Sequence, residues 1–164
     1  RKIFQGLVRI AYFDFKDGRI RKARDLLRIR IIYPKGKKPF TELVYKKYEG
    51  VKDACKRFDE TEFVLPELQD SQKLEHFLNL LGLKRTIFYE KKRTLYRWEK
   101  VCFEIDEHPK IPPFLEIEAP SSREINVAVA LLGLQDNEQT AETISELLRR
   151  KYPDILLNNL VFDE

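Results

Sequence analysis

Four short segments of this chain carry charged residues at every second position of an otherwise apolar run. Because successive side chains of a β-strand point to opposite faces, the two charges of each segment would share one face of a strand. Lys46, between Val44 and Tyr48, adds a single charge of the same kind. The four pairs are Arg28 and Arg30, Lys91 and Arg93, Glu104 and Asp106, and Glu116 and Glu118.

The positive members of this set suit an anion with several phosphates. Guanidinium groups pair with phosphate oxygens through two parallel hydrogen bonds, and lysine adds a compact point charge. Several such groups on one surface would match several linked phosphates. The candidate phosphate-binding residues are Arg28, Arg30, Lys46, Lys91 and Arg93.

The negative members suit a divalent cation. Carboxylate oxygens are hard ligands of the kind that Mg²⁺ and Mn²⁺ prefer. We therefore take Asp106, Glu116 and Glu118 as candidate metal ligands and catalytic residues. Cations and carboxylates in one cavity could hold a metal–polyphosphate complex, where catalysis is mostly positioning, charge neutralisation and metal activation of a nucleophile.

Two arrangements of the strands fit this alternation. In an open sheet that buries the apolar side chains, every charge would face water and carry no function. In a sheet closed into a barrel, with helices packed outside, the charges would line the lumen. They would then need a ligand or a metal, because unpaired charges away from water are costly. The residues by themselves leave both arrangements open.

The elements that would position these residues can be read from the hydrophobic periodicity. Alternation predicts seven strands, joined mostly by short connections. Apolar residues at helical spacing predict one helix from about Asp70 to Gly82, one from Ser121 to Gly133, and one over residues 139–152. This order indicates an α+β protein built on a mostly antiparallel sheet that can close into a barrel. The predicted strands span residues 7–15, 26–33, 41–49, 55–65, 87–98, 100–106 and 114–118.

Composition limits the class of protein. The 164 residues indicate one domain, 1–164, in which 154–164 form a C-terminal tail. The chain is 35% charged, but its net charge of +4 argues against a polycation built for nucleic acid. Cys55 and Cys102 are too few for a disulfide framework, and no apolar run reaches the roughly 18 residues of a membrane span. We expect a cytoplasmic protein that binds neither nucleic acid nor membrane, since no signal peptide is visible.

Five motifs, in order along the chain, resemble those of the CYTH superfamily, the triphosphate tunnel metalloenzymes. This superfamily includes class IV adenylate cyclases, thiamine triphosphatases and inorganic triphosphatases. The likeness runs from Tyr12-Phe13-Asp14 to the final helix, which is nearly the whole chain. The motifs are Leu27-Arg28-Ile29-Arg30, Val44-Tyr45-Lys46, Lys91-Lys92-Arg93, Glu104-Ile105-Asp106 and Ile111-Pro112-Pro113-Phe114-Leu115-Glu116-Ile117-Glu118.

The resemblance implies a closed antiparallel β-barrel with helices outside and a tunnel that binds a triphosphate. It implies that the candidate cations grip phosphates and that Asp106, Glu116 and Glu118 hold Mg²⁺ or Mn²⁺. The family's opening strand carries Glu-x-Glu-x-Lys, which no segment here matches. The residues from Leu7 resemble the strand after the first helix, so the opening strand and helix are expected upstream of Arg1.

The strand from Lys56 to Glu62 resembles the Arg-x-Glu-x-Glu strand of the family, but its register is ambiguous. Either Arg57 and Asp59 face inward, or Lys56, Glu60 and Glu62 do. We favour Arg57 as an additional phosphate contact.

The resemblance leads to a metal-dependent hydrolase of inorganic triphosphate or a nucleoside triphosphate. One alternative is a class IV adenylate cyclase that makes cyclic AMP and pyrophosphate from ATP, since its tunnel residues would be similar. Another is a domain that binds polyphosphate without turning it over. We favour hydrolysis because a tunnel that recognises only phosphates needs no base-recognition element, and we identify none. Whether the chain forms a homodimer stays open.

Overall fold

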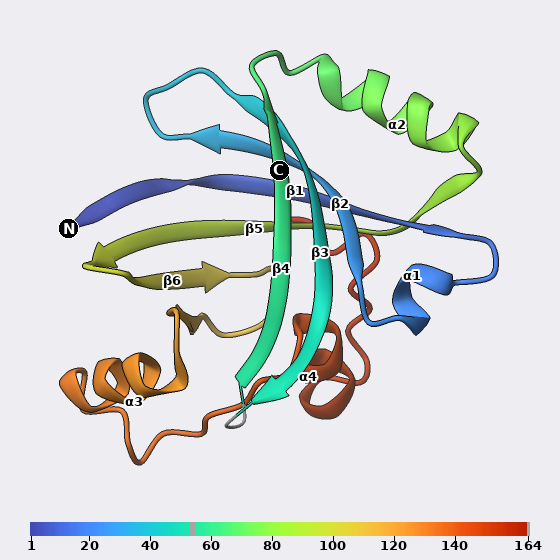
Figure 1. Ribbon diagram of the computed structural model, residues 1–164. Coiled ribbons are helices and arrows are strands. Elements are labelled where there is room, and N and C mark those ends of the chain that lie inside the picture. Colours follow the sequence, from blue (N-terminus) through green and yellow to red (C-terminus); the bar gives the residue numbers. More distant parts are fainter. Residues whose placement is uncertain (53–54, 164) are drawn as a thin grey trace.

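One antiparallel sheet of seven strands dominates the computed structural model, which describes residues 1–52 and 55–163 (Figure 1). Every strand that the alternation predicted is present. The first and fifth begin earlier than predicted, because they pair with each other from Lys2 opposite Tyr96 to Phe15 opposite Leu83. The strands are β1 (Lys2–Phe15), β2 (Leu26–Pro34), β3 (Phe40–Lys52), β4 (Cys55–Leu65), β5 (Leu83–Trp98), β6 (Val101–Glu107) and β7 (Phe114–Glu118).

The strands follow the order β4-β3-β2-β1-β5-β6-β7, which makes β4 and β7 the edges of the sheet. Figure 1 shows that the sheet curls, so that β3 and β4 pass in front of β5 and β6. The predicted fold class, an antiparallel barrel-like sheet with helices packed outside, is confirmed. The sheet is a half-barrel: within the described residues no hydrogen-bonded ladder joins β4 to β7.

Two helices cover the convex face of the sheet. Helix α1 (Arg19–Lys22) contributes Ile20, and helix α2 (Asp70–Leu80) contributes Leu78, to a core with Phe13, Ile29 and Leu83 of the strands. Sequence periodicity did not predict α1. The buried carboxylate of Asp14 positions this short helix by accepting hydrogen bonds from the backbone amides of Ile20 (3.0 Å) and Arg21 (3.1 Å).

Helix α3 (Ser122–Leu131) follows β7 and begins where predicted. The hydroxyl of Ser121 caps it by accepting a hydrogen bond from the amide of Glu124 at 3.3 Å. Figure 1 shows α3 beside the end of the sheet formed by β6 and β7. None of the described helices is long and apolar enough to span a membrane.

Helix α4 (Ile144–Lys151) is shorter than the predicted helix over 139–152. It begins at a capping box in which Thr143 and Glu146 bond each other's backbone amides. Unlike α1 and α2, it lies on the concave side: Leu148 packs with Ile10 and Tyr89 in a second core. The predicted C-terminal tail is docked there too.

The tail is held to β5 by backbone hydrogen bonds. The amide of Asn159 donates to the carbonyl of Phe88 at 2.7 Å, and the amide of Glu90 donates to the carbonyl of Leu160 at 2.9 Å. Leu160 itself is buried. The concave face is therefore apolar at one end, under α4 and the tail, and charged over the rest.

Candidate functional site

The carboxylates of β6 and β7 meet the basic side chains of β5 on the concave face. In the antiparallel ladders Arg93 lies opposite Asp106, and Glu104 lies opposite Glu116. Directly opposed residues share a face, so these side chains converge. The sequence predicted the alternation within each strand, and the register between strands makes it a site.

Arg93 is the centre of this convergence. Its Nε donates to Asp106 Oδ1 at 2.6 Å, and its Nη2 donates to Asp106 Oδ2 at 2.6 Å and to Glu116 Oε2 at 3.1 Å. Its Nη1 also pairs with Glu104. Lys91 Nζ donates to Asp106 Oδ2 at 2.7 Å. Burial alone would raise the pKa of Asp106, but the hydrogen bonds from Arg93 and the charge of Lys91 outweigh burial and lower that pKa.

Three carboxylates around Arg93 form what we call the acidic cluster: Glu104, Asp106 and Glu116. One oxygen of each lies within 4.8 Å of the others, close enough to bind one ion. Glu118, a predicted ligand, is exposed and lies outside this cluster. Burial, together with the charges of Glu118 and Glu116, raises the pKa of Glu104 to about 7, against the opposing charge of Arg93.

The other predicted cations gather on β2 and β3, where each faces a carboxylate. We call this group the β2–β4 wing. Arg30 Nε lies 2.7 Å from Glu42 Oε2, and Arg30 Nη2 donates to Glu62 Oε2 at 2.7 Å. The remaining contacts are Lys46 Nζ to Glu60 Oε2 at 2.9 Å and Arg28 Nη2 to Glu60 Oε1 at 3.9 Å.

The register of β4 differs from the one that we favoured. Lys46 pairs with Glu60 and Val44 with Glu62, so that Glu60 and Glu62 share the concave face with the cations. Arg57 lies on the opposite face and is exposed, because its neighbours alternate with it along the strand. Arg57 is therefore not placed to contact phosphate in the tunnel, and that prediction was wrong.

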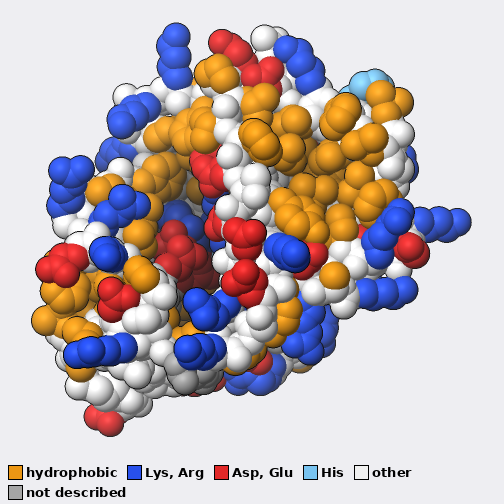
Figure 2. All heavy atoms as spheres, viewed as in Figure 1, with side chains coloured by type: hydrophobic (Ala, Val, Ile, Leu, Met, Phe, Trp, Pro, Cys, Tyr) orange, Lys and Arg blue, Asp and Glu red, His pale blue; other side chains and the backbone are white. Residues whose placement is uncertain are grey.

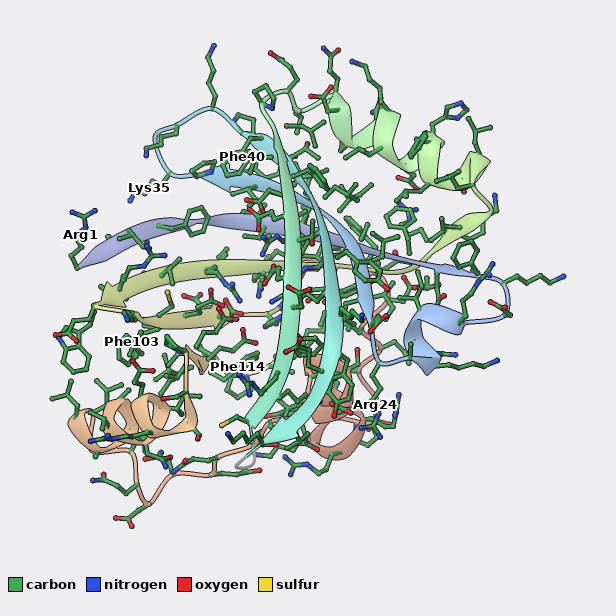
Figure 3. The ribbon with its side chains drawn as sticks, viewed as in Figure 1. Arg1, Arg24, Lys35, Phe40, Phe103 and Phe114 are labelled. Carbon is green, nitrogen blue, oxygen red and sulfur yellow. The ribbon has the colours of Figure 1, made fainter. Side chains whose placement is uncertain are left out.

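Figure 2 shows the result on the molecular surface. Acidic and basic side chains gather in a hollow on the open side of the half-barrel, bordered by hydrophobic side chains. In Figure 3 the sticks of β2, β3, β5 and β6 crowd this same side, and Phe114 marks the start of β7. Two groups thus share one concave face: the acidic cluster with Lys91 and Arg93, and the β2–β4 wing.

Residues 9–146 match the model of the CYTH domain. The chain belongs to the CYTH domain family. This agrees with the five motifs and with the tunnel-like sheet that carries their charges. A comparison with curated proteins gives no significant match.

Solved structures share the fold of this CYTH domain. The PH1819 protein of Pyrococcus horikoshii OT3 is 25% identical, with a TM-score of 0.71, over 92% of this chain and 88% of that one. A putative adenylyl cyclase from Hippeastrum, described as having a dominant triphosphatase activity, is 18% identical with a TM-score of 0.67, over 91% and 84%. A putative adenylate cyclase from Vibrio parahaemolyticus is 15% identical with a TM-score of 0.67, over 90% and 83%.

An aromatic row separates the charged part of the CYTH tunnel from the apolar end under α4. Tyr12 stacks on Tyr89 with ring centroids 6.2 Å apart, Tyr89 contacts His108 at 5.6 Å, and His108 stacks on Phe114 at 5.2 Å. Arg28 Nη1 donates to the hydroxyl of Tyr12 at 3.5 Å. Burial alone would raise the pKa of Tyr12, but Arg28, a hydrogen bond with Tyr89, and Lys91 lower it. Tyr12 therefore feels the cations of both groups.

His108 is the unusual member of the row. It is buried, and neither ring nitrogen has a hydrogen-bond partner within the described residues. Burial, with the positive charge of Lys91, lowers its pKa to about 4, so the imidazole is neutral at ordinary pH.

Sequence reasoning missed several residues of this site. It placed Glu104 on the same strand face as Asp106 but did not choose it as a ligand, because only the ladder to β7 sets Glu104 beside Glu116. It also did not single out Glu42. The Lys46–Glu60 pair could have been found from the opposite charges of two strands joined by a hairpin.

Proposed function

We propose that this CYTH domain binds a triphosphate with a divalent cation and hydrolyses it. The observation that carries the proposal is the meeting of five cations and three carboxylates on one concave face. The family membership supports a triphosphate as the ligand. The five cations are Arg28, Arg30, Lys46, Lys91 and Arg93.

The cations would bind and neutralise the phosphates. Arg28 is nearly all buried, and its Nε has no hydrogen-bond partner among the described residues. A buried guanidinium with a free N–H is poised to take a phosphate oxygen as its partner. Arg30 and Lys46 extend this surface along β2 and β3, so several phosphates of one chain could be held together.

The acidic cluster fits a divalent metal. Glu104, Asp106 and Glu116 offer three hard oxygen ligands within 4.8 Å of one another, which suits Mg²⁺ or Mn²⁺. When bound, such an ion supplies charge neutralisation at the phosphate oxygens and activation of a water.

The chain's own residues supply the positioning. Arg93 contacts all three carboxylates, so it would stand between the metal ligands and the phosphates and hold the two in register. Lys91 keeps Asp106 ionised by its contact at 2.7 Å. Fixed positive groups of this kind stabilise the charge that develops on a transferring phosphoryl group.

We favour hydrolysis over cyclisation. The charged groups gathered on the concave face match phosphate and metal, and none of them recognises a nucleoside base. The aromatic rings nearby stack on one another and lie beside the core under α4. This supports inorganic triphosphate or the triphosphate part of a nucleotide as the ligand.

The test is to incubate the purified chain with tripolyphosphate or ATP and with Mg²⁺, Mn²⁺ or EDTA. Release of orthophosphate that needs the metal, and that falls in Glu116→Gln and Arg28→Ala, is expected. Cyclic AMP and pyrophosphate from ATP would instead identify a cyclase. Binding of tripolyphosphate without turnover would identify a polyphosphate-binding domain. If both variants match an active wild type, the site assignment is wrong.

A further inference from the structure

The β2–β4 wing balances its own charge. Its three cations, Arg28, Arg30 and Lys46, are matched by three carboxylates, and no ligand is needed to neutralise it. This is an unusual state for a surface that would hold a polyanion. A phosphate that enters the wing must take the place of a carboxylate. The three carboxylates are Glu42, Glu60 and Glu62.

These carboxylates differ in how firmly they are held. The side chain of Glu42, on the inner strand β3, is only 9% exposed. Those of Glu60 and Glu62, on the edge strand β4, are each 35% exposed. Because β4 borders the open side of the half-barrel, Glu60 and Glu62 can turn toward water, whereas Glu42 cannot do so without exposing buried backbone.

The contacts of Glu60 and Glu62 are the ones that a phosphate would make. Carboxylate and phosphate oxygens accept the same charge-assisted hydrogen bonds from guanidinium and ammonium groups. Glu62 occupies Nη2 of Arg30 at 2.7 Å, and Glu60 bridges Lys46 at 2.9 Å and Arg28 at 3.9 Å. The two glutamates thus stand where two phosphates could stand.

Resting on the function proposed above, we infer that Glu60 and Glu62 are displaceable internal counter-ions. They hold the places of phosphate groups on Arg28, Arg30 and Lys46, and they make the wing select linked phosphates over single ones.

The selectivity follows from the exchange. One orthophosphate replaces one carboxylate by similar contacts, so it gains little. Two linked phosphates replace both glutamates in one event, and the second contact forms at a high effective concentration because the first has already formed. After the exchange Arg30 keeps its contact with Glu42, so the guanidinium stays in position while its outer nitrogen changes partner.

The experiment measures binding by calorimetry with Mg²⁺ and one of three probes: orthophosphate, pyrophosphate or imidotriphosphate, whose P–N–P links resist hydrolysis. The wild type is compared with Glu60→Gln, Glu62→Gln and the double variant. The double variant should bind orthophosphate and pyrophosphate about tenfold more tightly than the wild type does. The preference for imidotriphosphate over orthophosphate should shrink.

Asp59→Asn is the matched control. It removes one negative charge from the same strand, but Asp59 is exposed on the other face and has no ion pair within the described residues. Its affinities should equal those of the wild type. The single variants carry the test if the double variant does not show the wild-type circular dichroism spectrum.

Unchanged affinities and unchanged preference in folded Glu60 and Glu62 variants would overturn the inference, while binding of imidotriphosphate by the wild type would leave the proposed function standing. If only the double variant binds imidotriphosphate, the inference holds and the wild-type function proposed above is wrong. If no variant binds any probe, both are wrong.

Discussion

Arg93 and Asp106 form a two-point pair across β5 and β6, with Nε–Oδ1 and Nη2–Oδ2 distances of 2.6 Å each. The same guanidinium reaches Glu116 on β7 at 3.1 Å. One arginine therefore connects three strands, and it touches both the residues that would hold a metal and the space where phosphates would lie. This pair is the point at which geometry and charge of the site depend on each other.

Arg93→Lys should separate charge from geometry at this point. Lysine keeps the positive charge but cannot bond both oxygens of Asp106 and also reach Glu116. We expect kcat/KM for tripolyphosphate to fall by about 100-fold, because a positioned charge at the transferring phosphoryl group is lost. Steady-state phosphate release measures the change.

Arg97→Ala is the control for Arg93→Lys, since Arg97 is exposed further along the same strand. Wild-type kcat/KM in Arg93→Lys would show that the fork has no part in turnover. A loss of equal size in Arg97→Ala would show that the effect is a general one of charge.

Glu116→Gln and Glu118→Gln should differ in metal binding. Glu116 belongs to the acidic cluster, whereas Glu118 is exposed outside it. Loss of one carboxylate ligand should weaken Mn²⁺ binding by about tenfold or more in Glu116→Gln, and by much less in Glu118→Gln. Titration of Mn²⁺ followed by electron paramagnetic resonance reports free ion directly. Equal weakening in the two variants would contradict the cluster as defined.

Arg28→Ala and Arg57→Ala test which arginine contacts phosphate. Arg28 is buried on the concave face, and Arg57 is exposed on the convex one. Arg28→Ala should lower the affinity for imidotriphosphate by about 10- to 100-fold, because a charge-assisted hydrogen bond in a buried site is lost. Arg57→Ala should bind as the wild type does. A loss in Arg57→Ala alone would restore the register that the structure excludes.

His108→Phe should change how stability depends on pH. The pKa of His108 is about 4 in the folded chain and is near 6.5 for a free histidine. The unfolded chain therefore binds the proton more readily, and this contribution to stability falls as pH drops through 6.5 toward 4. Between pH 7.5 and pH 5 it costs the wild type about 2 kcal/mol, which the phenylalanine variant would not lose.

Urea unfolding at both pH values measures the free energy of unfolding for this test. Glu104, whose pKa burial raises to about 7 from 4.5, acts in the opposite sense, because its contribution is lost as pH rises through that range. The difference between wild type and variant removes this shared contribution. His76→Phe is the control, since His76 is exposed on α2. An equal pH dependence in wild type and His108→Phe would refute the prediction.

The alternation of apolar and charged residues by itself determined much of this protein. It located seven strands, the pairs of charges that share a face, and the family motifs, because a two-residue period is a local property of a strand. Helix starts were readable where a cap is local, as at Ser121. The helix at 139–152 was predicted too long, because its start depends on the capping box between Thr143 and Glu146.

Only the tertiary structure decided which charges meet. The register of β4 against β3 turned Glu60 and Glu62 inward and Arg57 outward, because a shift of one residue reverses every side chain of a strand. The ladder from β6 to β7 brought Glu104 to Glu116 and left Glu118 exposed. The docking of α4 and Leu160 on the concave face was equally hidden, since it rests on contacts between residues far apart in the chain. Local pattern set the chemistry available, and long-range pairing set the site.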